Sequence, residues 1–249
     1  MQLSPPPSER LTVVCPSGTR SYLWEQQELF DLGLGRGSDA VRFIDNHLVE
    51  PNRSISRDDT RQAVDDLKAL LGLTELVAVP VLHRCRAWGL VLAHASGWKT
   101  VFSGDTMPSE ELVVAGRGAS LLVHEATMED GLEDMARAKG HSTFGQAIDV
   151  ARRMGARHLL LTHFSARYPK LPPLSVRARS PSSLTAEKLA GGAEEPVEPV
   201  VAVAFDLATM RLDQFWQVER FRPAMDALLG WEDDAKEDTT EAGSVAGEK

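Results

Sequence analysis

Short apolar runs, broken by few polar residues, restrict the fold of this 249-residue chain more than any other feature. They occupy residues 74–82, 89–95, 98–103, 119–123 and 158–162. Nearly continuous apolar runs of this length are typical of strands that are covered on both faces. Helical patterns at 60–71, 109–116 and 144–154 alternate with them. The sequence therefore predicts an α/β or layered α+β protein.

The other segments complete one predicted domain over residues 11–230, after a loose lead-in at residues 1–10. Within that domain, residues 172–198 are rich in Pro, Ser, Ala and Glu and are predicted to be a flexible insertion. Residues 231–249 hold seven acids and are predicted to be a disordered acidic tail. The remaining predicted elements are a strand at 11–14, a helix at 21–31, a strand pair at 199–206 and 209–217, and a helix at 222–230.

The net charge of −9 argues against a nucleic-acid partner for the chain as a whole. The charge is uneven, however, because residues 152–179 contain seven Arg or Lys and no acid. This segment is either a solvated face or a surface that meets phosphates, and charge alone leaves both open. Cys15 and Cys85 are too few for a disulfide framework or a thiolate zinc site, which favours a reducing compartment. No apolar run is long enough to span a membrane.

Residues that can bind a metal ion stand where four of the apolar runs end. They are His83, Asp105, Glu125 and His163, and a fifth candidate, His141, directly precedes a predicted helix. Strand ends are favoured positions for functional sites, because rigid strands hold short side chains at fixed points. Imidazole and carboxylate groups together are the ligands of Zn²⁺ and similar ions.

Each of these residues, taken alone, also has an ordinary structural interpretation. A histidine after a strand is more often hydrogen-bonded within the fold, and an aspartate after Ser-Gly often bonds its own backbone in a turn. Five such residues at consecutive element ends favour a shared metal site, but the pattern by itself leaves the structural interpretation open. The positions of His47, His94 and His158 favour a structural or surface role.

Five short segments match one protein family in order and spacing. They are Ser96-Gly97-Trp98-Lys99, Ser103-Gly104-Asp105-Thr106, His124-Glu125-Ala126-Thr127, His141-Ser142-Thr143 and His163-Phe164-Ser165. These segments resemble the metallo-β-lactamase superfamily and, within it, the eukaryotic long form of ribonuclease Z. The resemblance is close over residues 77–171 and loose over residues 11–76. It implies an αββα sandwich and a zinc-dependent endonuclease that removes the 3′ trailer of precursor tRNA.

The resemblance also implies a role for each candidate residue. His83 and His163 match histidine ligands of zinc, and Asp105 matches an aspartate that bridges two zinc ions. His141 matches a histidine proposed to protonate the leaving oxygen, and Glu125 matches a glutamate that orients this histidine. A histidine suits such a role because it can give up a proton near neutral pH.

The substrate and the compartment are implied in the same way. Precursor tRNA is the expected partner, and we expect its phosphates to contact Arg84, Arg86, Arg167 and Lys170. The family resemblance implies a nuclear enzyme, a mitochondrial enzyme, or both.

The sequence departs from the family at the central motif His-x-His-x-Asp-His, which is absent. By analogy, one zinc ion keeps only His83 and Asp105 and the other only Asp105 and His163, fewer than the three protein ligands of known catalytic zinc sites. The N-terminal β-layer is also expected to be incomplete, which leaves apolar sheet surface uncovered. Three explanations stay open: a fragment of a longer enzyme, one half of a split enzyme whose N-terminal half supplies the missing ligands, or a non-catalytic binding module.

Overall fold

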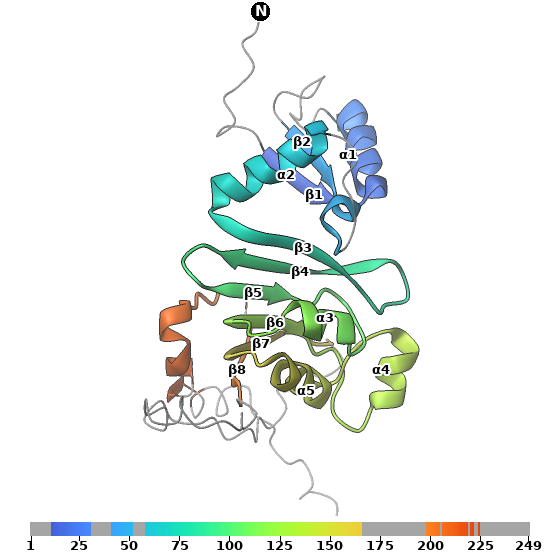
Figure 1. The fold of residues 1–249 in the computed structure, drawn as a ribbon. Helices are drawn as coiled ribbons and strands as arrows, with labels where there is room; N and C mark the ends of the chain where they lie inside the picture. Colours follow the sequence, from blue (N-terminus) through green and yellow to red (C-terminus); the bar gives the residue numbers. More distant parts are fainter. Residues whose placement is uncertain are drawn as a thin grey trace, which may run out of the picture.

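The strands of the protein form two sheets, one of two strands and one of six (Figure 1). They are seen in a computed structural model, which describes residues 11–30, 41–51, 58–165, 198–204, 206–218, 220–221 and 224. The mixed α/β architecture confirms the predicted fold class. The helices in this part of the chain are all too short or too polar to cross a membrane.

The larger sheet has the strand order β3-β4-β5-β6-β7-β8. Its first three strands pair antiparallel, and the pairs from β5 to β8 are parallel. The bounds are Leu73–Val81 for β3, Ala87–His94 for β4, Lys99–Phe102 for β5, Leu121–Glu125 for β6, His158–Thr162 for β7 and Val200–Val203 for β8. Two antiparallel steps separate β3 from β5, so β3, β5, β6 and β7 all run in one direction. Their carboxyl ends therefore meet at one edge of the sheet.

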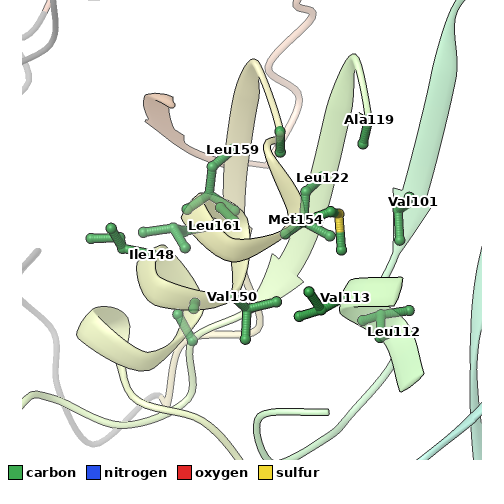
Figure 2. Packing of buried hydrophobic residues seen from close by; sticks show 14 of the residues in the cluster. Val101, Leu112, Val113, Ala119, Leu122, Ile148, Val150, Met154, Leu159 and Leu161 are labelled. Carbon is green, nitrogen blue, oxygen red and sulfur yellow. The ribbon is translucent and has the colours of Figure 1, made fainter. Parts of the chain in front are cut away.

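One face of this sheet packs against the helices α3 (Glu110–Ala115) and α5 (Phe144–Met154). Thr143 and Gln146 form a capping box that starts α5, and the helix ends at Gly155. The core between the helices and the sheet consists of fully buried aliphatic side chains, among them Leu112, Leu122, Val150, Met154, Leu159 and Leu161 (Figure 2). Each such side chain stabilises the fold by about 1.5–3 kcal/mol, so this packing fixes the strand ends rigidly.

The smaller sheet lies next to β3 and β4, and one of its helices packs on β3 (Figure 1). The parallel strands β1 and β2 form this sheet. The elements of this layer are β1 (Leu11–Cys15), α1 (Ser17–Phe30), β2 (Val41–Asp45), the 3-10 helix η2 (Asn46–Val49) and α2 (Asp58–Leu71). Ile44 of β2, Val64 of α2 and Leu76 of β3 are buried in a second apolar cluster.

A row of apolar residues remains partly exposed on the face of the large sheet opposite α5. Phe102, Val123 and Leu160 are paired across β5, β6 and β7. They alternate with the residues that pack under α5, so they point to the other face. Phe102 is 41% exposed, and Val123 and Leu160 are half-buried. This row agrees with the expectation that apolar sheet surface is left uncovered.

Most of the elements follow the predicted ones to within a few residues. The predicted strand at 158–162 has the observed bounds, and the hairpin of β4 and β5 is confirmed. The strand predicted at 209–217 is wrong, because residues Leu212–Gln217 form the 3-10 helix η5. β2 and the helix α4 (Glu133–Lys139) were not anticipated. The lead-in, the acidic tail and nearly all of the insertion and of the helix at 222–230 lie outside the described residues.

Candidate metal centre

The predicted site residues meet at the sheet edge where the parallel strands end. His83 follows β3, Asp105 follows β5, Glu125 is the last residue of β6, and His163 follows β7. His141 stands before α5, two residues ahead of its capping residue Thr143. The common direction of these strands explains why residues up to 80 positions apart share one edge.

Asp105, His141 and His163 form the group in the described part of the chain that can hold a metal ion. One ligand atom of each lies within 4.8 Å of the others. Nε2 of His163 is 3.7 Å from Oδ1 of Asp105, and the rings of His141 and His163 stack with centroids 5.4 Å apart. The ring of His83 lies next to that of His141, at a centroid distance of 4.9 Å, but His83 is not part of this group. This set of oxygen and nitrogen atoms suits a metal cation such as Zn²⁺.

The carboxylate of Glu125 organises the polar groups behind this cluster. Oε1 accepts hydrogen bonds from the backbone N–H of Thr106 at 2.7 Å and from Nδ1 of His141 at 2.8 Å. Oε2 accepts from the hydroxyl of Thr127 at 2.6 Å and from the backbone N–H groups of Thr127 and Ser142. Glu125 is 1% exposed, and both of its carboxylate oxygens are hydrogen-bonded, so the side chain is buried with every oxygen satisfied. It therefore orients His141 from a fixed position.

The histidine rings are oriented by hydrogen bonds to their Nδ1 atoms. Nδ1 of His83 donates to the backbone carbonyl of Gly140 at 2.7 Å, and Nδ1 of His141 donates to Glu125. Nδ1 of His163 lies 2.8 Å from the hydroxyl oxygen of Thr127. Because a neutral imidazole carries one N–H, a donating Nδ1 leaves Nε2 with a free lone pair. Metal-binding histidines are commonly held in this way, so these rings suit a bound cation.

Backbone conformation brings two of the side chains into place. Gly104, directly before Asp105, has φ +60, and a Cβ there would lie 2.7 Å from the carbonyl oxygen of Trp88. His163 has φ +61, a left-handed conformation that is uncommon and strained outside glycine. Strain of this kind concentrates at functional sites, where the surrounding structure holds it.

His124, the neighbour of Glu125, is not part of the group that can hold a metal ion. It is fully buried, and Nδ1 donates to the backbone carbonyl of Glu125 at 2.6 Å, while Nε2 has no partner. Burial lowers the pKa of His124 because the charged form loses its hydration. His124 is therefore a buried, neutral side chain of the fold.

The other predicted residues are placed as follows. Arg84 and Arg86 are exposed on the connection between β3 and β4, directly after His83. Arg167 and Lys170 lie outside the described residues. The histidines expected to be structural make local contacts: His47 with Glu50, His94 with Ser96, and His158 with the carbonyl of Ser120.

Sequence reasoning missed the hydroxyl residues that surround Glu125. Thr106 donates its backbone N–H to that carboxylate, and its side-chain oxygen accepts from the backbone N–H of Leu82. Ser142 donates its hydroxyl to the carbonyl of Thr106 at 2.7 Å. Threonine and serine are frequent and bond many partners, so their roles emerge only when the loops that carry them are brought together.

Comparison with known proteins agrees with this geometry. A family model described as the beta-lactamase superfamily domain matches residues 3–164. Human zinc phosphodiesterase ELAC protein 2 is 40% identical over 169 residues, which are 68% of this chain and 20% of the human protein. Ribonuclease Z 1 of Schizosaccharomyces pombe is 33% identical over 167 residues, which are 67% of this chain and 20% of that protein. The chain thus spans about a fifth of the length of these curated relatives.

Two solved structures share the fold. The crystal structure of a long form RNase Z from yeast matches with a TM-score of 0.70 and 23% identity, over 90% of this chain and 31% of that one. The short form of human tRNase Z matches with a TM-score of 0.52 and 20% identity, over 83% of this chain and 69% of that one. On the family match over residues 3–164, the six-stranded sheet and the His/Asp cluster at its edge, the chain belongs to the metallo-β-lactamase superfamily.

Proposed function

We propose that this chain contributes the C-terminal part of a ribonuclease Z active site, which hydrolyses the phosphodiester bond at the 3′ end of precursor tRNA. The observation that carries the proposal is the cluster of Asp105, His141 and His163, backed by the buried carboxylate of Glu125. The relatives named zinc phosphodiesterase and ribonuclease Z support the reaction class.

Zinc is the metal that this donor set suits, with His83, Asp105 and His163 as its ligands in this chain. Imidazole nitrogens with free lone pairs and a carboxylate that two cations can share are characteristic zinc ligands. We infer two ions in the complete site. Zinc supplies Lewis acidity, which polarises the phosphate and makes water a stronger nucleophile.

His141 is suited to act as the general acid. Its Nδ1 is held by Glu125, and its ring is 16% exposed beside Asp105 and His163. In hydrolysis a water oxygen bonds to phosphorus, the bond from phosphorus to the 3′ oxygen of the tRNA breaks, and that oxygen takes a proton. An imidazolium whose Nδ1–H is bound to a carboxylate can release the proton on Nε2 to the leaving oxygen. The product is a tRNA with a 3′-hydroxyl.

The remaining ligands are proposed to come from an N-terminal half that carries His-x-His-x-Asp-His. Three ligands shared between two ions fall short of the three or more that each catalytic zinc ion needs. The partly exposed row of Phe102, Val123 and Leu160 offers an apolar surface on which such a layer can pack. The same shortage of ligands favours a second candidate, a non-catalytic module that binds tRNA.

Arg84 and Arg86 are proposed to bind phosphates of the substrate. Both are exposed and follow His83 within three residues, so they flank the centre. Their guanidinium groups can bind phosphate oxygens bidentately.

A cleavage assay with a supplied N-terminal half tests the proposal. The zinc-loaded chain is mixed with a long-form N-terminal segment containing His-x-His-x-Asp-His, and precursor tRNA cleavage is followed. We expect cleavage after mixing, and loss of cleavage when the chain carries Asp105→Ala but not when it carries Asp134→Asn, a change on the exposed face of α4. Binding of tRNA with no cleavage under any zinc concentration would support the non-catalytic module instead.

A further inference from the structure

The hydroxyl of Thr127 connects Glu125 to His163. Thr127 Oγ1 lies 2.6 Å from Oε2 of Glu125 and 2.8 Å from Nδ1 of His163. A third contact, to Nδ1 of His141, is longer at 3.4 Å. Thr127 stands two residues after the end of β6, and His163 follows β7, so the contact joins two adjacent parallel strands.

The directions of the hydrogen bonds that link Glu125, Thr127 and His163 follow from the carboxylate of Glu125, which accepts. Glu125 receives hydrogen bonds from backbone N–H groups on both oxygens, so it accepts and the hydroxyl of Thr127 donates its single hydrogen to it. Toward Nδ1 of His163 the hydroxyl oxygen of Thr127 can then only accept a hydrogen bond. Nδ1 of His163 must therefore carry a hydrogen, and in the neutral ring Nε2 is then bare.

We propose that Thr127 is a positioning residue, which fixes the neutral tautomer of His163 with the hydrogen on Nδ1 and the lone pair of Nε2 directed at Asp105. The tautomer part of this inference rests on the apo protein alone. The consequence for metal binding rests on the proposed function, in which Nε2 of His163 binds zinc.

Among the described residues, the ring of His163 is restrained by the hydroxyl of Thr127 and by stacking on the ring of His141. The side chain is 48% exposed, and the distance from Nε2 to Asp105 is 3.7 Å, beyond a strong hydrogen bond. The backbone of His163 is in the strained left-handed conformation, which sets the direction of its side chain. A fixed hydrogen bond at Nδ1 removes the freedom of the ring to turn or to exchange tautomers.

The arrangement also ties the metal ligand to the proposed acid. One oxygen of Glu125 holds His141, and the other holds Thr127. Replacement of Thr127 by valine removes the hydroxyl and keeps the shape, whereas replacement by serine keeps the hydroxyl. The two variants therefore separate hydrogen bonding from packing.

Nitrogen-15 NMR of the histidine rings tests the tautomer in the chelator-treated 249-residue chain, at about pH 8.5, where exposed imidazoles are neutral. We expect the protonated nitrogen of His163 to be Nδ1 in the wild type and in Thr127→Ser, and a mixture of tautomers in Thr127→Val. The signals of His141 should keep a protonated Nδ1 in all three proteins, because Glu125 still holds it. An unchanged His163 spectrum in Thr127→Val, with native backbone amide signals, would overturn the inference.

Zinc titration of the same three proteins gives the second readout. We expect Thr127→Val to bind zinc about 10–100-fold more weakly than the wild type, and Thr127→Ser to bind as the wild type does. Equal affinity of Thr127→Val and the wild type would contradict the positioning role at the metal. Absence of zinc binding by the wild type would instead contradict the assignment of His83, Asp105 and His163 as zinc ligands of the isolated chain, and the NMR result would still decide the tautomer.

Discussion

Nδ1 of His141 lies 2.8 Å from Oε1 of Glu125, a carboxylate whose side chain is only 2% exposed. Glu125 is the last residue of β6 and His141 lies in the loop before α5, and these two elements pack together through the buried core. The ring of His141, the proposed proton donor, is thereby held by a carboxylate that solvent hardly reaches. The stability of the fold and the chemistry of the site depend on the same carboxylate.

Glu125→Gln is expected to destabilise the protein by about 1–3 kcal/mol, because the amide group turns a donor toward the donors of Thr106, Thr127 or Ser142 and leaves at least one unsatisfied. Urea unfolding measures the change. Asp134→Asn is the control, since Asp134 is almost fully exposed and its loss should change stability by less than about 0.5 kcal/mol. Equal stability of Glu125→Gln and the wild type would show that the carboxylate is not held as described.

The strained backbone at His163 leads to an inverted order of stability between two variants. A protein with alanine at a given position is normally at least as stable as one with glycine there. At φ +61, however, the Cβ of alanine is sterically unfavourable, whereas glycine adopts this conformation without a penalty. His163→Gly should therefore be more stable than His163→Ala by about 1 kcal/mol in urea unfolding. The opposite order would mean that residue 163 is not left-handed in the folded protein.

The buried ring of His124 should make stability fall as the medium becomes acidic. Burial lowers the pKa of His124 in the folded protein. Below pH 6.5 the imidazole of His124 therefore binds a proton in the unfolded chain while it stays neutral in the folded one. The contribution of the neutral His124 ring to the free energy of unfolding is complete above pH 6.5 and is lost as the pH falls toward the lowered pKa. His124→Gln should flatten the decline of unfolding free energy between about pH 7 and 5, by up to about 1.4 kcal/mol per pH unit. Parallel curves for the wild type and the variant would contradict burial of a neutral ring.

The double substitution Arg84→Ala and Arg86→Ala is expected to weaken binding of precursor tRNA and to make it less dependent on salt. Each lost phosphate contact lowers the salt slope by about one. Arg211→Ala is the matched control, because Arg211 is exposed but already paired with Asp213 at 2.9 Å. Binding measured over a salt series should separate the two, and identical slopes for all three proteins would remove these arginines from the RNA surface.

Most strands of the large sheet and the candidate site residues could be predicted from the sequence. Each strand shows as an apolar run, and each candidate residue is a polar residue at the end of such a run or before a helix. Three leucines in a row, Leu159 to Leu161, precede Thr162 and His163, so the polar residues at the end of this run stand out. The order of the strands places these ends together, as the shared direction of β3, β5, β6 and β7 shows. Common strand direction is a property of parallel α/β folds, so the clustering of the site could be predicted.

Other features depend on contacts that no local pattern records. The role of Thr127 requires β6 and β7 to be adjacent, and Ser142 reaches Glu125 only after the loop before α5 folds back. The 3-10 helix at Leu212–Gln217 was predicted as a strand, although Phe215 is buried against His158 of the sheet. An apolar residue in a short run signals burial, and tertiary packing decides the backbone conformation that achieves it.

Titration of zinc into the chelator-treated chain, compared between the wild type and Asp105→Ala, tests the central claim most directly. The account predicts that the wild type binds zinc and that Asp105→Ala, which loses the carboxylate facing His163, binds at least about tenfold more weakly. Asp134→Asn should bind as the wild type does. Equal zinc binding by the wild type and Asp105→Ala, with both proteins folded, would contradict the assignment of the metal centre.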